Sequence, residues 1–170
     1  VMSHKIALLL ILIFIYTSCS TSRNDGELAH YVGDISFDPS QDDPKFMLCD
    51  DQDNIFQYFN FGRGMQIKGE KKALDRYIKN KFKKTKATDN GYVRVRFVVN
   101  CKGETGRYRL LVSDLNFKEI ILSKELTHQL LEITKGIKGW QIIYHEGKNR
   151  DYYQYLTYKI INGDIKEILP

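Results

Sequence analysis

The chain is poor in proline, in cysteine and in long apolar runs. Its three prolines are Pro39, Pro44 and Pro170, which excludes a stiff proline-rich spacer. Beyond residue 19, every apolar stretch is interrupted by charge and is shorter than the ~20 residues that cross a bilayer. No C-x-x-C pair or closely spaced histidine pair suggests a metal site, and no serine lies in a nucleophile-elbow pattern. We therefore expect no metal, no cofactor and no enzymatic activity.

The start of the chain has the layout of an export signal. Lys5 precedes the apolar run Ile6–Tyr16, and Thr17, Ser18 and Cys19 follow it. One basic residue, about a dozen apolar residues and then small residues are typical of a secretory signal peptide, and the run is too short for a comfortable membrane span. We therefore expect the mature protein to leave the cytoplasm.

The cysteine that follows two small residues resembles the bacterial lipobox, in which this cysteine becomes the lipidated N-terminus. The resemblance implies a signal peptide over residues 1–18 and lipidation of Cys19, although Tyr16 stands where leucine is commonest. The alternative is an uncleaved helix or a plain secretory peptide. Ser20 follows and no acidic cluster comes after it, which by resemblance to lipoprotein sorting rules favours the outer membrane, with the domain facing the periplasm.

Two cysteines are left for the folded part, Cys49 and Cys101. An even number of cysteines in an exported chain favours a disulfide. Closing a loop of about 50 residues would remove roughly 4 kcal/mol of unfolded-state entropy. The alternative is a pair of buried free thiols, because the sequence does not show how closely the two residues approach.

The formal net charge of +5 is concentrated in one stretch. Nine basic residues lie between Lys68 and Lys86, against Glu70 and Asp75. Such a stretch suits anionic lipid headgroups or an acidic envelope polymer, although a solvated helix face is the more ordinary interpretation. Nucleic acid is not an expected partner of an exported protein. The basic face that we expect comprises Lys71, Lys72, Arg76, Lys79 and Lys83.

Hydrophobic patterning divides the mature chain into a tether and one domain. Residues 19–45 are polar without sustained periodicity and form the predicted lipidated N-terminus and tether, within which a short ordered piece is allowed around Tyr31–Phe37, whereas residues 46–170 form the predicted domain. Helical spacing predicts a helix over 70–84 and another from Ser123, with its apolar residues continuing to Trp140. Gly136 and Gly139 lower helix propensity, so we expect the last turn of the second helix to fray or to end early. Alternating apolar residues predict strands, and Asn162–Gly163 predicts a two-residue turn between the last two of them. These strands are residues 92–99, 107–112, 151–160 and 164–168.

The order helix, strand, strand, helix, strand, strand predicts an α+β fold, with two helices packed on one face of an antiparallel sheet. Gly91–Asn100, followed by Lys102–Gly106, resembles the first hairpin of the TonB C-terminal domain family. Gly139 and Trp140, and then the strand Tyr152–Ile160, resemble the tryptophan-marked loop and closing strand of that family, although Gln141 replaces its usual proline. The likeness covers about residues 68–170.

The resemblance implies partner binding by strand addition, whereas the departures from the family argue against energy transduction. A TonB energy transducer has a long proline-rich spacer, whereas a flexible tether of about 25 residues reaches only roughly 25 to 30 Å. We therefore expect a module that binds another envelope protein at a sheet edge. Tyrosines on the face opposite the core offer rigid contact area, although ordinary cross-strand packing is the alternative. The expected partner-binding residues are Tyr153, Tyr155, Asp164, Ile165 and Lys166.

Overall fold

The computed structural model describes residues 33–62 and 65–169. The predicted signal peptide, Cys19 and residues 19–32 of the predicted tether lie outside the described residues. The described residues belong to one compact unit. Within them, no helix is both long enough and apolar enough to cross a membrane.

The α-helices of the described part are α3 and α4, and both are amphipathic. α3 spans Glu70–Lys81 and buries Leu74 and Ile78. It begins after Gly69, whose φ of +81° lies in the left-handed region that favours glycine, and it ends where Phe82 becomes extended. The predicted helix over 70–84 is therefore confirmed, with an end a few residues earlier.

α4 spans Lys124–Lys135. Ser123 holds the N-cap position without a side-chain capping bond, and its hydroxyl instead donates to Asp89 Oδ2 at 2.6 Å. The helix ends before Trp140, as the two glycines lead us to expect: Gly136 is its C-cap, and Gly139 has a φ of +90°. Trp140 nevertheless reaches the core from the following loop.

The main sheet has the strand order β1–β6–β2–β3, and β7 also pairs with β6. β2 (Gly91–Val99) is central and antiparallel to both β3 (Thr105–Ser113) and β6 (Tyr152–Ile161). β7 (Asp164–Leu169) returns antiparallel along β6. The two-residue strand β1 (Phe56–Gln57) is parallel to β6. The fold is thus α+β with a mostly, rather than wholly, antiparallel sheet.

A separate hairpin stands between α4 and β6. Its strands are β4 (Ile143–His145) and β5 (Lys148–Arg150). The sequence does not predict it, because neither three-residue strand is long enough to show an alternation. Glu146 and Gly147 connect the two strands, and both have positive φ values, of +50° and +84°.

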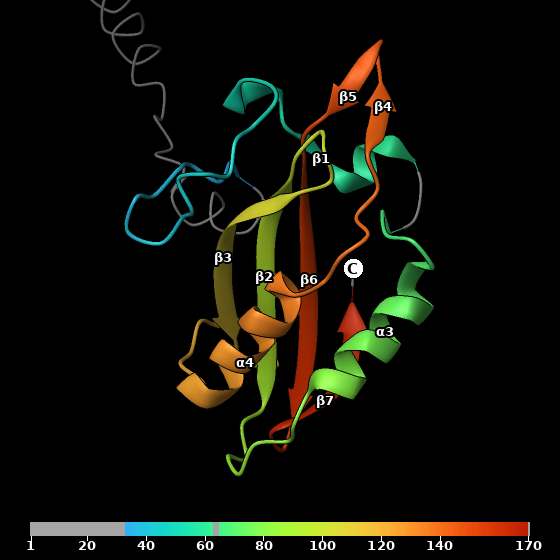
Figure 1. The fold of residues 1–170 in the computed structure, drawn as a ribbon. Coiled ribbons are helices and arrows are strands. Elements are labelled where there is room, and N and C mark those ends of the chain that lie inside the picture. The colour runs from blue at the N-terminus through green and yellow to red at the C-terminus, as the bar shows by residue number, and fades with distance from the viewer. Residues whose placement is uncertain (1–32, 63–64, 170) are drawn as a thin grey trace, which may run out of the picture. The chain divides into compact units, whose positions relative to one another are not determined.

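One face of the sheet, the front face, carries both helices (Figure 1). Alternate residues of β2 and β6 point into this layer because side chains alternate across a strand. Leu126 and Leu130 of α4 and Leu74 and Ile78 of α3 pack on them and are at most 1% exposed. The sheet residues of this core include Val93, Val95, Phe97, Val99, Tyr152, Leu156, Tyr158 and Ile160.

Residues 33–55 cover part of the opposite face, the back face. Ile35 is 2% exposed and packs with Val98 and Tyr153. Asp42 Oδ1 accepts a hydrogen bond from Arg109 of β3 at 2.7 Å. Residues 33–45 thus contribute to the domain, because the back face offers apolar and charged partners to this polar segment. The prediction of a tether is wrong for residues 38–45, whereas the sequence allows an ordered piece around residues 31–37.

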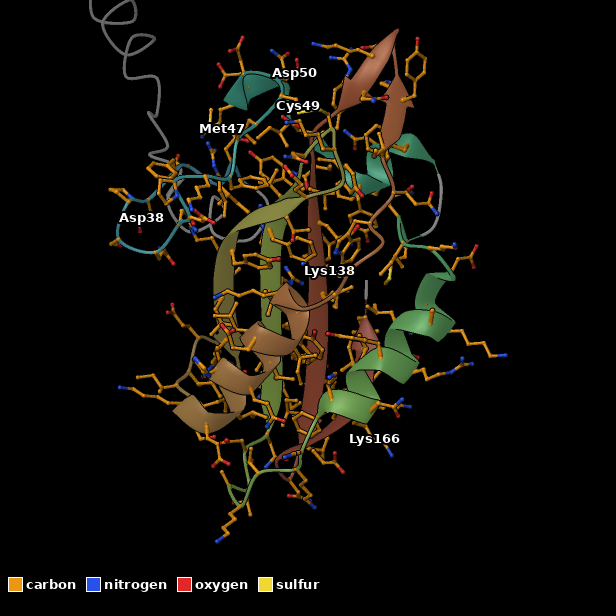
Figure 2. The ribbon with its side chains drawn as sticks, viewed as in Figure 1. Asp38, Met47, Cys49, Asp50, Lys138 and Lys166 are labelled. Atoms are coloured by element: carbon orange, nitrogen blue, oxygen red, sulfur yellow. A yellow bond between two sulfur atoms is a disulfide. The ribbon has the colours of Figure 1, made fainter. Side chains whose placement is uncertain are left out.

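The predicted disulfide between Cys49 and Cys101 is confirmed, with a Cα–Cα distance of 5.9 Å. It joins the segment 33–55 to the turn after β2 (Figure 2). The buried Asp151 carboxylate lies beside it. Its Oδ2 accepts the backbone N–H groups of Cys49 and Asp50 at 2.7 and 3.0 Å, and its Oδ1 accepts that of Cys101 at 2.8 Å. The disulfide and this carboxylate hold the same junction.

Candidate functional site

The first tyrosine predicted to contact a partner, Tyr153, is buried. It is 1% exposed because residues 33–55 lie over it. Its hydroxyl accepts the N–H of Ile35 at 3.3 Å and donates to Asp34 Oδ1 at 3.2 Å. Burial raises the pKa of Tyr153 to about 12. The expectation that Tyr153 offers an exposed ring is therefore wrong.

The second tyrosine, Tyr155, is half-buried on the back face. Its ring meets that of Tyr58 edge to face, with 5.2 Å between centroids, and the Arg94 guanidinium lies 5.2 Å from its centroid. Burial and a hydrogen bond with Tyr155 raise the pKa of Tyr58 to about 12. Tyr155 is partly accessible, and its contact with a partner stays a prediction.

β7 forms one edge of the sheet. Among the described residues it pairs only with β6. Asp164 and Lys166 are exposed and Ile165 is half-buried. Lys166 is the extra residue where the register shifts against Lys159 and Ile160. A bulge and charged side chains both discourage indiscriminate strand pairing. This predicted edge therefore has no further strand partner among the described residues but is protected against unspecific pairing.

β3 forms the other edge. At its C-terminal end, the carbonyl of Val112 accepts the N–H of Ile120 at 3.4 Å, on the side away from β2. Backbone groups alternate between the two sides of an antiparallel strand, and the pairing with β2 is regular from Arg109 to Ser113. The N–H and carbonyl of Leu110 therefore also face outward, where no described strand pairs with them.

A groove adjoins this edge, between α4 and residues 41–46. Two hollows of about 330 and 410 Å³ share Asp43, Thr105 and Lys138 as lining residues. Figure 2 labels Lys138, which follows the C-terminal end of α4. The larger hollow also includes Phe46, and the smaller one includes Tyr108 and Leu131.

Local backbone features shape the groove. Gly106 lies under the Phe46 ring, where an added Cβ would come within 2.3 Å of Phe46 Cγ. The neighbouring Arg107 has a φ of +52° at the point where β3 shifts register against β2. Such a bulge redirects side chains beside a strand edge. The glycine and the bulge together let residues 41–46 approach β3 closely.

Charges of both signs line the groove. Asp42 forms two hydrogen bonds with Arg109, at 2.7 and 2.8 Å. Burial opposes ionisation, but hydrogen bonds from Arg109 and from the Asp38 backbone lower the pKa of Asp42. Across the groove, Lys135 pairs with Glu132 at 2.9 Å. This mixture of charged walls and apolar lining suits a peptide better than an apolar small molecule.

The predicted basic face lies on α3 and just beyond it. Lys72, Arg76 and Lys79 recur at spacings of four and three, and so they share one stripe of the helix. The side chains of all five predicted basic residues, including Lys71 and Lys83, are exposed. None of them forms an ion pair with another described residue.

The histidines of the described part lie apart. His128 is exposed on α4, and His145 of β4 meets the rings of Phe56 and Phe61 edge to face. Over residues 33–62 and 65–169, one group has the spacing of a metal site, formed by Cys49, Cys101 and Asp151. Both sulfur atoms are joined in the disulfide, so this group has no thiolate to offer a metal.

No protein-family model, curated protein or solved structure matches this chain. The groove is the feature that sequence reasoning missed. One wall comes from residues 41–46, a polar stretch without periodicity, and the other from the end of α4. The closest sequence signal is Gly106, which interrupts the apolar alternation of β3 at the position where Phe46 packs.

Proposed function

We propose that the chain is a cell-envelope lipoprotein whose TonB-C-like domain binds another envelope protein by strand addition. The proposal rests on the outward N–H and carbonyl of Leu110, on an open strand edge whose first residues, Thr105 to Tyr108, line the groove. An added strand would gain main-chain hydrogen bonds from β3, and its alternate side chains would enter the groove. Main-chain bonds provide affinity in this mode, and the groove provides selectivity.

The β3 edge is better suited than the β7 edge that we expected from the sequence. Both edges carry a bulge. Only the β3 edge, however, adjoins one of the hollows described above, and α4 forms its far wall. A strand edge beside a helix gives a peptide a backbone ladder on one side and side-chain contacts on the other. Leu110, 37% exposed, would border the incoming strand.

The proposed location rests on the N-terminal pattern of the sequence. A lipid on Cys19 would hold the domain at the outer membrane, facing the periplasm, and a tether of residues 20–32 would keep it close to that surface. Partners would then be envelope proteins that offer an extended segment within reach. The domain would act as a binding module and would not transmit energy from an inner-membrane motor.

A pair of variants at Leu110 tests the edge. Leu110→Pro removes the outward N–H without removing a donor to β2, because proline is tolerated where the N–H side of an edge strand is free. Leu110→Ala removes the side chain and keeps the N–H. Full-length protein would be purified from envelopes in mild detergent, and the proteins that co-purify would be identified by mass spectrometry. We expect a specific protein to co-purify with the Leu110→Ala variant and to be absent from the Leu110→Pro preparation.

Two further measurements make the outcome decisive. The midpoint temperature of thermal unfolding must be the same for the two Leu110 variants. Equal midpoints show that the proline has not disturbed the fold. A photo-cross-linking residue at position 138, in the groove, should capture the same partner, whereas one at position 166, on β7, should not. Retention of the partner by Leu110→Pro would contradict strand addition at β3. Loss of the partner in Lys166→Pro alone would move the site to β7.

A further inference from the structure

Three apolar side chains are exposed in the connection between β3 and α4. Leu115 is 42% exposed, Phe117 67% and Ile121 95%. They fall within seven residues, next to the end of the sheet where β2 begins and β3 ends. Clustered exposed apolar residues on a soluble domain mark an interaction site more often than scattered ones do.

The connection has a defined conformation. Asp114 N–H donates to the Lys118 carbonyl at 2.8 Å, and Asp114 Oδ1 accepts the N–H groups of Asn116 and Lys118 at 2.8 and 2.9 Å. Phe117 has a φ of +63°, and its ring stacks on Tyr92 with 5.0 Å between centroids and an interplanar angle of 3°. The turn therefore fixes which apolar side chains point into solvent.

A basic loop joins the same end of the sheet. Lys83, Lys84 and Lys86 are exposed in the connection from α3 to β2 and form no ion pair with another described residue. Asp89 anchors this loop to the start of α4, because its Oδ2 accepts the N–H and hydroxyl of Ser123 at 3.2 and 2.6 Å. The basic and apolar residues are thus held on one structural unit.

We propose that this end surface, formed by Leu115, Phe117, Ile121, Lys83, Lys84 and Lys86, contacts an anionic lipid bilayer. Apolar side chains beside lysines match the boundary between acyl chains and headgroups, where the rings and aliphatic groups enter and the ammonium groups meet phosphates. Lysine stems extend along apolar surface while the charge stays in water. An anionic polymer would use the lysines but leave the exposed apolar residues without a role. Lys118 and Glu119, both exposed in the same turn, offset each other, so the net positive charge comes from the basic loop and the turn contributes mainly apolar contact.

This surface is distinct from the proposed groove. Turns at the end of the sheet form it, whereas the groove lies where β3 begins and α4 ends. The β6–β7 turn lies at the same end of the sheet as this surface, because the Gly163 N–H donates to the Asp89 carbonyl at 2.9 Å. The β4–β5 hairpin stands at the opposite end (Figure 1). Tyr144 of that hairpin is 72% exposed and provides a matched aromatic control for Phe117.

Tryptophan fluorescence of the full chain reconstituted in vesicles tests the contact. Phe117→Trp and Tyr144→Trp would be compared in phosphatidylglycerol and in phosphatidylcholine vesicles that contain brominated lipid, with the native Trp140 as common background. We expect a blue shift and at least twofold stronger quenching at position 117 than at position 144, in anionic vesicles only. Changing Lys83, Lys84 and Lys86 to Gln should reduce the quenching, and so should 0.5 M salt, because salt screens exposed charges.

Each outcome is decisive. Equal quenching at positions 117 and 144 would overturn the proposal, because the bilayer would then not distinguish the two ends of the sheet. Quenching that is unchanged by the lysine substitutions would remove the role of the basic loop. An electrostatic interaction that leaves position 117 unquenched would indicate an anionic polymer or headgroup contact without insertion, and would also overturn it. Leu110→Pro should leave the quenching unchanged, so this test does not depend on strand addition.

Discussion

The two faces of the sheet are stabilised in different ways. The front face is covered by two helices, and its core consists almost wholly of aliphatic and aromatic side chains. The back face carries arginines, and the segment that covers it is held by a disulfide, an Arg–Asp pair, a few apolar contacts and hydrogen bonds with the sheet and with Asp151. Front-face stability is therefore spread over a large apolar area, whereas back-face cover depends on a small number of specific links.

The Tyr158 hydroxyl shows how the front face accommodates a polar group. It shares a hydrogen bond of 2.7 Å with Thr134 Oγ1 of α4. Burial raises the pKa of Tyr158 well above its usual range. A buried hydroxyl costs little when it has a partner, so this core keeps its tyrosine without a charged neighbour.

Removing the disulfide is the strongest way to break the back-face cover. The two cysteines are 52 residues apart, and the chain-entropy model gives a loss of about 4 kcal/mol in the free energy of unfolding for Cys49→Ser with Cys101→Ser. Denaturant unfolding measures the loss. Hydrogen exchange should show that the Ile35 amide loses protection before amides of β2. Simultaneous loss at both positions would mean that the two faces unfold as one unit.

A large-to-small change in the front core gives the contrasting case. Leu126 is fully buried between α4 and the sheet, and Leu126→Ala should lower the free energy of unfolding by about 3 kcal/mol because it leaves a cavity. Protection should fall throughout the sheet. Leu115→Ala, at an exposed leucine, is the control and should change stability by less than about 0.5 kcal/mol. A local effect of Leu126→Ala, confined to α4, would weaken the distinction between the faces.

The Asp151 carboxylate separates the contribution of hydrogen bonds from that of the disulfide. It supports the same connection between residues 33–55 and the turn after β2, but by hydrogen bonds alone. Asp151→Asn leaves one acceptor oxygen for three backbone N–H groups and places an NH₂ group against a donor. We expect a loss of about 2 kcal/mol, within the range for a buried donor left unsatisfied. The exposed Asp53→Asn serves as the control. Equal stability of the two variants in chemical denaturation would refute the role of Asp151.

Acid should destabilise the packing of residues 33–55 on the back face, by less than the variants above. Hydrogen bonds from Ser40 and Gln41 lower the pKa of Asp38 to about 2, and the pKa of Asp42 is also lowered. Because both carboxyls have lower pKa values folded than unfolded, their stabilisation is complete above the ordinary value of 3.8. It is lost as the pH falls toward about 2. Asp42→Asn should cost roughly 1 kcal/mol at neutral pH and reduce this acid dependence. A wild-type and variant pair with parallel stability curves from pH 5 to pH 2 would contradict this.

Local patterns predict the elements whose neighbours lie close in the sequence. The alternation of β2 and β3, the turn at Asn162 and Gly163, and the amphipathic spacing of α3 each depend on residues within one hairpin or one helix. The number of cysteines favours a disulfide between Cys49 and Cys101, but only the structure shows that the two residues lie close enough to form it. The apolar stripe continues past the end of α4 because Ile137 and Trp140 reach the core from the following loop, whereas Gly136 and Gly139 indicate the early end of the helix.

Residues 33–55 show why the rest was not predictable. Their packing depends on Val98, Tyr153 and Arg109, which are far away in sequence and lie on the back face. The alternation in the strands shows that this face is opposite the main core, but it does not show which segment covers it. The same segment buries Tyr153, which reverses the expectation for that ring, and forms one wall of the groove. A polar segment without periodicity does not predict which face of the sheet it will cover.

The sequence by itself determined the α+β class, the position of both helices and the central hairpin, because each follows from local periodicity, and the cysteine count favoured a disulfide without showing it. The tertiary structure alone decided which tyrosine is accessible, where the folded unit begins and which sheet edge adjoins a groove. Those features come from contacts between segments some 50 to 120 residues apart, whose energies depend on geometry that no short window of sequence contains.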